Sequence, residues 1–181
     1  NETAQTIDLY VSDSQDPVLF HQSSFNAYDG QSWWCGVKET QGYENHWLQY
    51  LETPRIDLSS TVSPELNFMA KWSIETSGGA EAPYDGWDGW NVWISTDNGE
   101  NFTVIEPESP AYHNAALWAF GHPEQGWNMG TSVKGWSGYS HHWENVKFDL
   151  SAYAGENIIL RFAFASRSEE RRVGKECATG C

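Results

Sequence analysis

Two aspartates on one glycine-rich loop are the residues of this chain whose type and spacing best suit metal chemistry. The loop runs from Tyr84 to Gly89 (YDGWDG), and Asp85 and Asp88 each stand directly before a glycine. Calcium prefers several carboxylate and backbone oxygens supplied by loops. Asp85 and Asp88 are therefore candidate ligands of a structural Ca²⁺. The alternative is that each side chain accepts hydrogen bonds from its own Asp-Gly turn.

The tryptophans suggest a second kind of chemistry, the recognition of sugars. The chain has 11 Trp, 8 Tyr and 8 Phe, and aromatic residues make up 15% of it. Large flat side chains fill the core of a β-rich fold, but on a surface they stack on sugar rings or contact a protein partner. Trp87, Trp93 and Trp118 are the candidate ligand-binding residues. Trp93 is chosen because it alternates with Trp90 and Val92 and so points away from the expected core.

Motifs for catalysis are scarce in this sequence. A zinc peptidase helix carries His-Glu-x-x-His, a pattern that does not occur around the six His at positions 21, 46, 113, 122, 141 and 142, so no zinc is expected. There is also no Gly-x-Ser-x-Gly elbow and no phosphate-binding loop. A glycosidase needs only two carboxylates about 5–10 Å apart. Because the chain has 25 Asp and Glu, a glycoside hydrolase or other hydrolase remains an alternative, but no catalytic residue is assigned.

The charge balance narrows the range of partners. Ten Lys and Arg stand against 25 Asp and Glu, a formal charge of −15 at pH 7. Binding to nucleic-acid phosphates needs stripes of Lys and Arg, so no nucleic-acid partner is expected. An acidic surface suits salty or calcium-rich extracellular fluid. No apolar run approaches the ~20 residues of a membrane helix, and no membrane span is expected.

A β-hairpin is the strongest structural prediction. Asn98-Gly99 lies between two alternating apolar runs, residues 90–95 and 101–105, and this dipeptide favours a tight turn with positive φ at both residues. Further strands are expected at residues 6–11, 32–35, 47–51 with 55–58 (interrupted at Pro54), 66–74, 143–150 and 157–166.

These alternating runs predict an all-β fold, namely an antiparallel β-sandwich of jelly-roll type, because no ten-residue segment keeps helical spacing. The 181 residues suit one domain. Residues 106–139 have no clear pattern and contain Trp118, Trp127 and Trp136. A loop of this length is uncommon unless it has a function, so recognition is expected there.

The last fifteen residues differ from the rest of the chain. Residues 167–177 read RSEERRVGKEC, which resembles the translation of a common sequencing adapter. Residues 1–166 are therefore expected to be the domain, and residues 167–181 a non-native tail, as in a metagenomic fragment. Cys177 and Cys181 belong to this tail. Cys35 then has no disulfide partner, and it is interpreted as a small buried hydrophobe rather than a nucleophile.

Four stretches in order resemble the jelly-roll accessory module of secreted bacterial proteins such as immune inhibitor A-like metallopeptidases, a module that is similar to MAM-type domains. They are SWWCG at 32–36, GYENHWLQYLETPRIDLS at 42–59, the hairpin at 84–105, and FDLSAYAGENIILRFAFAS at 148–166. The resemblance covers residues 25–166 and implies that a structural calcium is common in such modules. The family usually ends in a strand of the type Gly-Trp-Tyr-Ile-Asp-Asp-Ile. This chain is therefore expected to lack its last strand and to leave an open sheet edge.

The resemblance implies a non-catalytic accessory or adhesion module of a larger secreted or cell-surface protein, which would itself be a protease in some cases. Its expected location is extracellular, and its expected partners are neighbouring domains of the same chain, a glycan or an extracellular protein. A carbohydrate-binding module that uses exposed Trp is the alternative, and a hydrolase is the third possibility.

Overall fold

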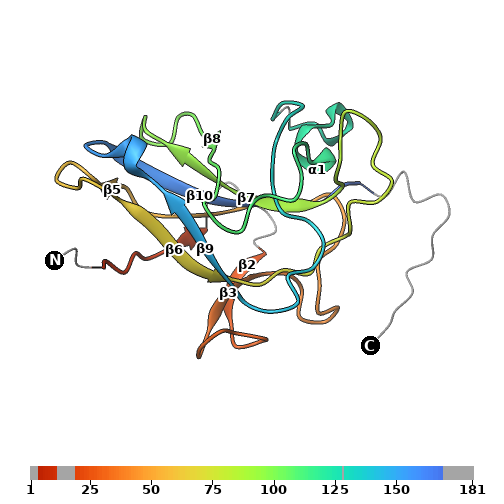
Figure 1. Cartoon of the computed structure of the whole chain (residues 1–181). Coiled ribbons are helices and arrows are strands. Elements are labelled where there is room, and N and C mark those ends of the chain that lie inside the picture. Colours follow the sequence, from red (N-terminus) through yellow and green to blue (C-terminus); the bar gives the residue numbers. More distant parts are fainter. Residues whose placement is uncertain (1–3, 12–18, 128, 169–181) are drawn as a thin grey trace.

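The structure, a computed structural model, describes residues 4–11, 19–127 and 129–168 (Figure 1). Within this part of the chain all strand pairing is antiparallel. The strands are β1 (Tyr10–Val11), β2 (Phe20–Ser23), β3 (Ser32–Cys35), β4 (Leu48–Glu52), β5 (Ile56–Asp57), β6 (Glu65–Ala70), β7 (Gly89–Ser95), β8 (Thr103–Val104), β9 (Glu144–Asp149) and β10 (Asn157–Ala165). The helical elements are short and comprise α1 (Trp118–Gly121) and the 3₁₀ turns η1 (Pro123–Gln125) and η2 (Ser151–Tyr153).

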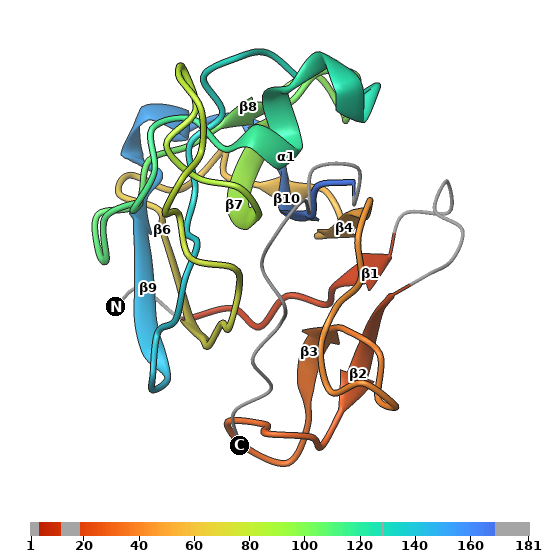
Figure 2. The same cartoon turned by 90° about the vertical axis from the view of Figure 1, so that its right-hand side faces the viewer.

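The larger layer is a sheet in the order β1-β4-β10-β7-β8, in which β5 continues the pairing of β10 beyond β4. The smaller layer is the pair β6–β9, and β2–β3 forms a separate ribbon. Figure 2 shows β6 and β9 to the left of the large sheet and the β2–β3 ribbon below β4. The predicted all-β antiparallel sandwich is confirmed, while its jelly-roll connectivity stays a prediction.

The core lies between these layers because alternate side chains of each strand point into it. Val92 and Ile94 of β7, Phe148 of β9, and Leu160 and Phe164 of β10 all belong to one buried cluster. The predicted core-facing side of residues 90–94 is therefore confirmed, and alternate residues of 158–164 face the same core. The strand expected at residues 6–11 is much shorter in the structure and covers only β1.

The interruption at Pro54 is also as predicted, because β4 and β5 pair with the same strand, β10. Thr53 bridges the break: its amide donates to the Leu160 carbonyl at 3.0 Å, and its hydroxyl accepts the Leu160 amide at 3.0 Å. Proline cannot donate to a sheet ladder, so a side-chain oxygen takes over where the regular pairing stops.

The hairpin turn has the predicted backbone, with φ of 62° at Asn98 and 90° at Gly99. The loop is longer than a two-residue turn, because β8 begins only at Thr103. Ser95 organises it: the buried hydroxyl accepts the Gly99 amide at 2.9 Å and donates to Asp97 at 2.7 Å. Hydrogen bonds from Asn101 hold the pKa of Asp97 down at about 2.

Replacing Ser95 by Ala is expected to lower the free energy of unfolding by about 1–3 kcal/mol, because the Gly99 amide loses its acceptor. Urea denaturation followed by circular dichroism measures this change. Ser132→Ala is the matched control, since Ser132 is exposed and substitutions of exposed residues rarely change the free energy of unfolding by much. Equal midpoints for Ser95→Ala and Ser132→Ala would show that the loop does not depend on this hydroxyl.

The described residues of 106–139 are mostly irregular, as predicted, and they fold back onto the large sheet. Trp136 bridges to Trp90 of β7, and Asn114 bridges to Gly135. Figure 1 shows α1, which belongs to this segment, beside the end of β7. We call residues 106–139 the cover segment. No helix in the described ranges is long and apolar enough to cross a membrane, consistent with the expectation of no membrane span.

Candidate functional site

The Asp85 side chain ties the 84–89 loop to the cover segment. Its two carboxylate oxygens accept the amides of Ala115 and Ala116, each at 2.9 Å. The Asp85 carbonyl accepts the side-chain amide of Asn114 at 2.6 Å. These bonds span about thirty residues of sequence, so Asp85 holds two distant segments together.

The Asp88 side chain is buried, with 2% of its surface exposed. One carboxylate oxygen accepts the Arg167 amide at 2.8 Å, and the other accepts the Tyr43 hydroxyl at 2.9 Å. Burial, with a smaller contribution from the nearby Glu75, raises the pKa of the Asp88 carboxyl to about 6, against the opposing effects of Arg167 and Tyr43. The Tyr43 hydroxyl in turn accepts the Glu75 amide at 2.9 Å.

The two aspartates therefore have separate protein partners. Asp85 and Asp88 accept hydrogen bonds from donors in different segments of the chain. Neither carboxylate accepts a hydrogen bond from a backbone amide of its own Asp-Gly turn. In the described ranges, no group of three or more His, Cys, Asp and Glu is placed to hold a metal ion. The geometry does not assemble Asp85 and Asp88 as ligands of one ion, and calcium binding by this domain stays a prediction.

Replacing Asp88 by Asn is expected to flatten the dependence of stability on pH. Because the folded-state pKa is raised from 3.8 to about 6, the folded protein binds this proton more tightly than the unfolded chain. The free energy of unfolding then falls as pH rises from about 4 to about 6, by up to about 3 kcal/mol from this residue. Urea midpoints across that range test it, with Glu39→Gln at an exposed position as the control. The same pH slope in Asp88→Asn and the wild type would contradict it.

Arg167 and Ser168, the first residues of the expected tail, contact the domain. The Arg167 guanidinium donates to Glu75 at 2.9 Å and lies 4.2 Å from the Trp87 ring centre. The Ser168 amide donates to Gln125 at 3.1 Å. The remaining tail residues, 169–181 with Cys177 and Cys181, lie outside the described residues. The non-native origin of the tail stays a prediction.

Cys35 lies on β3, partly exposed, and packs against the main core cluster. Burial raises the pKa of its thiol well above the usual range, which keeps the sulfur protonated and unreactive. This environment agrees with the interpretation of Cys35 as a small hydrophobe.

Trp118, one of the three candidate tryptophans, is buried rather than exposed. Only 1% of its surface is accessible, and its ring stacks on His122 at 4.3 Å. Trp87 lies beside it at 6.2 Å, partly buried under the Arg167 guanidinium. The structure thus brings Trp87 and Trp118 together, but the prediction that Trp118 is an exposed platform is wrong, because the cover segment folds its own aromatic residue inward.

The prediction that Trp93 faces solvent is also wrong. Trp93 is 7% exposed and belongs to a second buried cluster with Leu117, Phe120 and Val133 of the cover segment. Its indole N–H donates to the Asn91 side chain at 2.6 Å. The alternation of the strand was interpreted correctly, but a distant segment covers the outer face of the sheet.

Five residues stand in register across five strands on this outer face. They are Tyr10, Glu52, Arg161, Trp93 and Val104. Tyr10 is 43% exposed, whereas Glu52 and Trp93 are each 7% exposed. The Arg161 Nε atom lies 2.5 Å from a Glu52 carboxylate oxygen, and the guanidinium carbon lies 3.5 Å from the Phe102 ring centre. This row ends at a groove.

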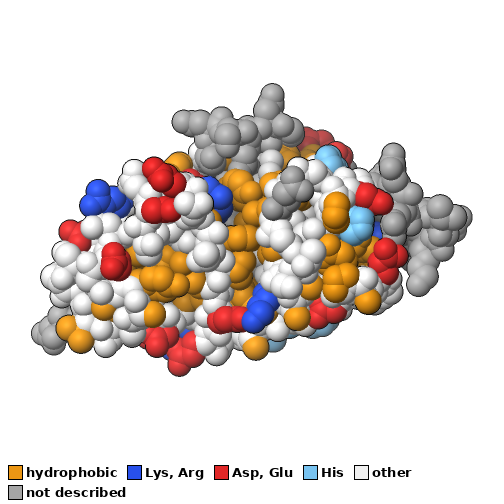
Figure 3. Space-filling view, turned by 90° about the horizontal axis from the view of Figure 1, so that it is seen from above, with side chains coloured by type: hydrophobic (Ala, Val, Ile, Leu, Met, Phe, Trp, Pro, Cys, Tyr) orange, Lys and Arg blue, Asp and Glu red, His pale blue; other side chains and the backbone are white. Residues whose placement is uncertain are grey.

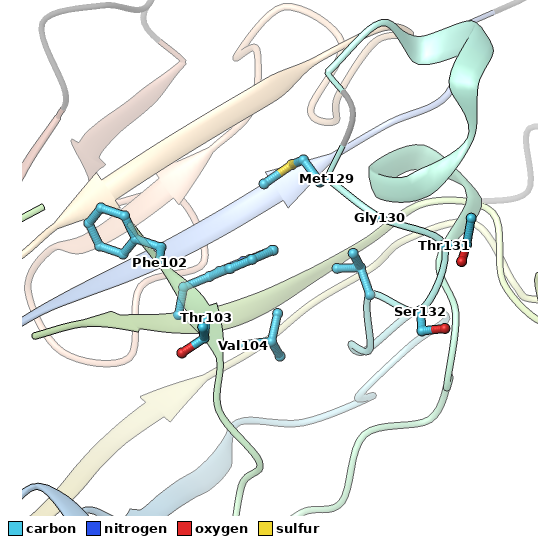
Figure 4. A pocket seen from close by; sticks show the side chains of 9 residues that line it. Phe102, Thr103, Val104, Met129, Gly130, Thr131 and Ser132 are labelled. Atoms are coloured by element: carbon cyan, nitrogen blue, oxygen red, sulfur yellow. The ribbon is translucent and has the colours of Figure 1, made fainter. Parts of the chain in front are cut away.

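The groove has a volume of about 390 Å³ and lies between β8 and the cover segment. It is lined by Trp93, Phe102, Thr103, Val104, Met129, Gly130, Thr131, Ser132 and Val133. Figure 4 shows Phe102 and Val104 on one side of the groove and Thr131 and Ser132 on the other, with Met129 between Phe102 and Thr131. Figure 3 shows hydrophobic side chains gathered between polar margins on the face seen from above. We call the groove lined by these nine residues the outer groove.

Two sequence observations point toward the outer groove, although neither defines it. Residues 129–133 belong to the segment in which recognition was expected, and Trp93 was a candidate ligand-binding residue. Phe102 belongs to the predicted hairpin run 101–105 and was not a candidate site residue. A comparison with protein-family models and with curated proteins finds no match. The resemblance to the accessory module stays a prediction.

Proposed function

We propose that this domain is a non-catalytic accessory or adhesion module of a larger secreted or cell-surface protein, such as a secreted metallopeptidase. It would act by contacting a neighbouring domain, an extracellular protein or a glycan. The outer groove carries this proposal, because an open apolar hollow on a chain of charge −15 is a surface suited to contact. The acidic charge supports the extracellular setting.

Assays of the whole chain test the absence of catalysis. We expect no turnover of protein or polysaccharide substrates, with or without added Ca²⁺ or Zn²⁺. Hydrolysis that disappears when a single carboxylate, such as Asp85 or Asp88, is replaced by its amide would overturn the proposal and favour the hydrolase. Both carboxylates already accept protein donors, which leaves them poorly placed for acid–base work.

A carbohydrate-binding module is the second candidate function, and the composition of the outer groove favours it. The aromatic side chains of Trp93 and Phe102 share the lining with the hydroxyls of Thr131 and Ser132. Small-ligand sites commonly combine an apolar surface with a few polar groups that orient the ligand. Titration with a panel of polysaccharides, followed by intrinsic Trp fluorescence and calorimetry, tests this function. No response to any sugar would remove it.

A further inference from the structure

We infer that the outer groove binds an uncharged glycan segment, whose sugar ring packs on Phe102 next to Trp93, a lining residue that is 7% exposed. This inference rests on the carbohydrate-binding function proposed above. It adds to that function a location, a class of ligand and the residues that select it.

The aromatic surfaces of the groove are held in place before any ligand arrives. The Trp93 indole is fixed by its 2.6 Å bond to Asn91 and by packing in the buried cluster of the cover segment. Phe102 is held by the Arg161 guanidinium, 3.5 Å from the ring centre. Arg161 is fixed in turn by its ion pair with Glu52. Surfaces that are ordered in advance lose little conformational entropy on binding.

The polar groups of the groove are hydroxyls, which match the chemistry of sugars. Thr131 and Ser132 are exposed and line the groove from the side of the cover segment, whereas Thr103 pairs with Ile94 and so lies on the opposite face of β8 from Val104. A hydroxyl both donates and accepts hydrogen bonds, so it can pair with sugar hydroxyls of either orientation. Apolar Val104, Met129 and Val133 supply the rest of the lining. A ligand with one apolar face and a hydroxyl margin fits this pattern.

The absence of charge in the lining selects against ionic ligands. None of the nine lining residues is ionisable at neutral pH, although 19% of the chain is charged. Two charged side chains beside lining residues are paired: Arg161, which lies over Phe102, pairs with Glu52, and Lys134, which follows Val133, pairs with Glu106. A sugar carboxylate or sulfate would therefore find no unpaired cation in the lining, and a cationic peptide would find no carboxylate there. The negative net charge further disfavours acidic polysaccharides.

Calorimetric titration of the whole chain with two sets of oligosaccharides tests the inference. One set is neutral, made of glucose, mannose or xylose units, and the other is acidic, made of galacturonate or guluronate units. We expect binding of at least one neutral member, with an affinity that does not fall as salt is raised. Phe102→Ala should weaken this binding about tenfold, since it removes the stacking surface.

Two further variants distinguish loss of binding at the groove from loss of folding. Ser132→Trp adds bulk at an exposed position and should block the groove, so we expect loss of binding at an unchanged melting temperature. Tyr28→Ala is the matched control for Phe102→Ala, because Tyr28 is an exposed aromatic residue on the β2–β3 connection. It should leave the affinity unchanged.

The titration results distinguish failure of the proposed carbohydrate-binding function from failure of the inference about the ligand and its site. If no glycan of either set binds, the carbohydrate-binding function fails and the inference fails with it. If only acidic glycans bind, the function stands and the uncharged class of ligand is wrong. If a neutral glycan binds equally to the wild type, Phe102→Ala and Ser132→Trp, the function stands and the outer groove is the wrong site. Binding of apolar peptides alone would overturn both.

Discussion

Replacing Trp136 by Ala is expected to lower the free energy of unfolding by about 3–5 kcal/mol, a large share of the 5–15 kcal/mol that holds a typical domain together. Trp136 is completely buried, and its ring centre lies 4.3 Å from that of Trp90 and 4.4 Å from that of Tyr112. Its indole N–H donates to the Ala111 carbonyl at 3.0 Å. The substitution leaves a cavity at the centre of the aromatic core and an unpaired carbonyl beside it.

Urea denaturation measures this loss, and two variants calibrate it. Trp136→Phe should cost less, because it keeps most of the apolar volume and loses only the indole hydrogen bond. Tyr139→Ala, three positions along the chain, should change the stability by less than about 0.5 kcal/mol, since Tyr139 is 54% exposed. Equal effects of the Trp136 and Tyr139 substitutions would mean that the cover segment is not part of the core.

Trp136 also marks where prediction from sequence reached its limit. The strands were predictable because alternation along β7, β9 and β10 is a local property, visible within six to nine residues. Trp136 enters the core from a segment with no periodicity, through an isolated bridge to Trp90. No local pattern announces such a contact, because it depends on a segment more than forty residues away along the chain.

The sequence of β7 indicates that its outer face is also covered, although the alternation of apolar residues by itself does not show this. β7 carries bulky apolar residues on both faces, with Val92 and Ile94 on one side and Trp93 on the other. Strands buried on both faces are apolar at nearly every position. The Trp93 side chain was therefore a sign of a second buried face rather than of a solvent-exposed platform.

The candidate site was predictable in part. The 84–89 loop was singled out for calcium binding and ligand binding, which stay predictions, and the structure shows that Asp85, Trp87 and Asp88 each contact a distant segment. Their partners were not predictable, because Ala115, Trp118 and Arg167 are brought to the loop only by the complete fold. The outer groove was less predictable still, since its two sides come from β8 and from residues 129–133.

Replacing Gly121 by Ala is expected to loosen the side of the outer groove that the cover segment provides. A Cβ atom at Gly121 would lie 2.2 Å from the Gly130 carbonyl oxygen and 3.3 Å from the Thr131 Cα atom. Both are backbone atoms, so one of the two segments must move. We expect a loss of about 1–3 kcal/mol in the free energy of unfolding. Hydrogen exchange should increase at residues 129–133, next to the new methyl group.

Gly78→Ala is the matched control, because a Cβ at Gly78 meets no atom within 4 Å and its φ lies outside the left-handed region. It should leave both stability and exchange unchanged. The comparison also connects the fold to the proposed ligand. Because Gly130 and Thr131 line the groove, a shift that starts at Gly121 should weaken the binding of a neutral glycan while the β6–β9 layer stays intact. Wild-type exchange at residues 129–133 in Gly121→Ala would show that this close backbone approach does not position the groove.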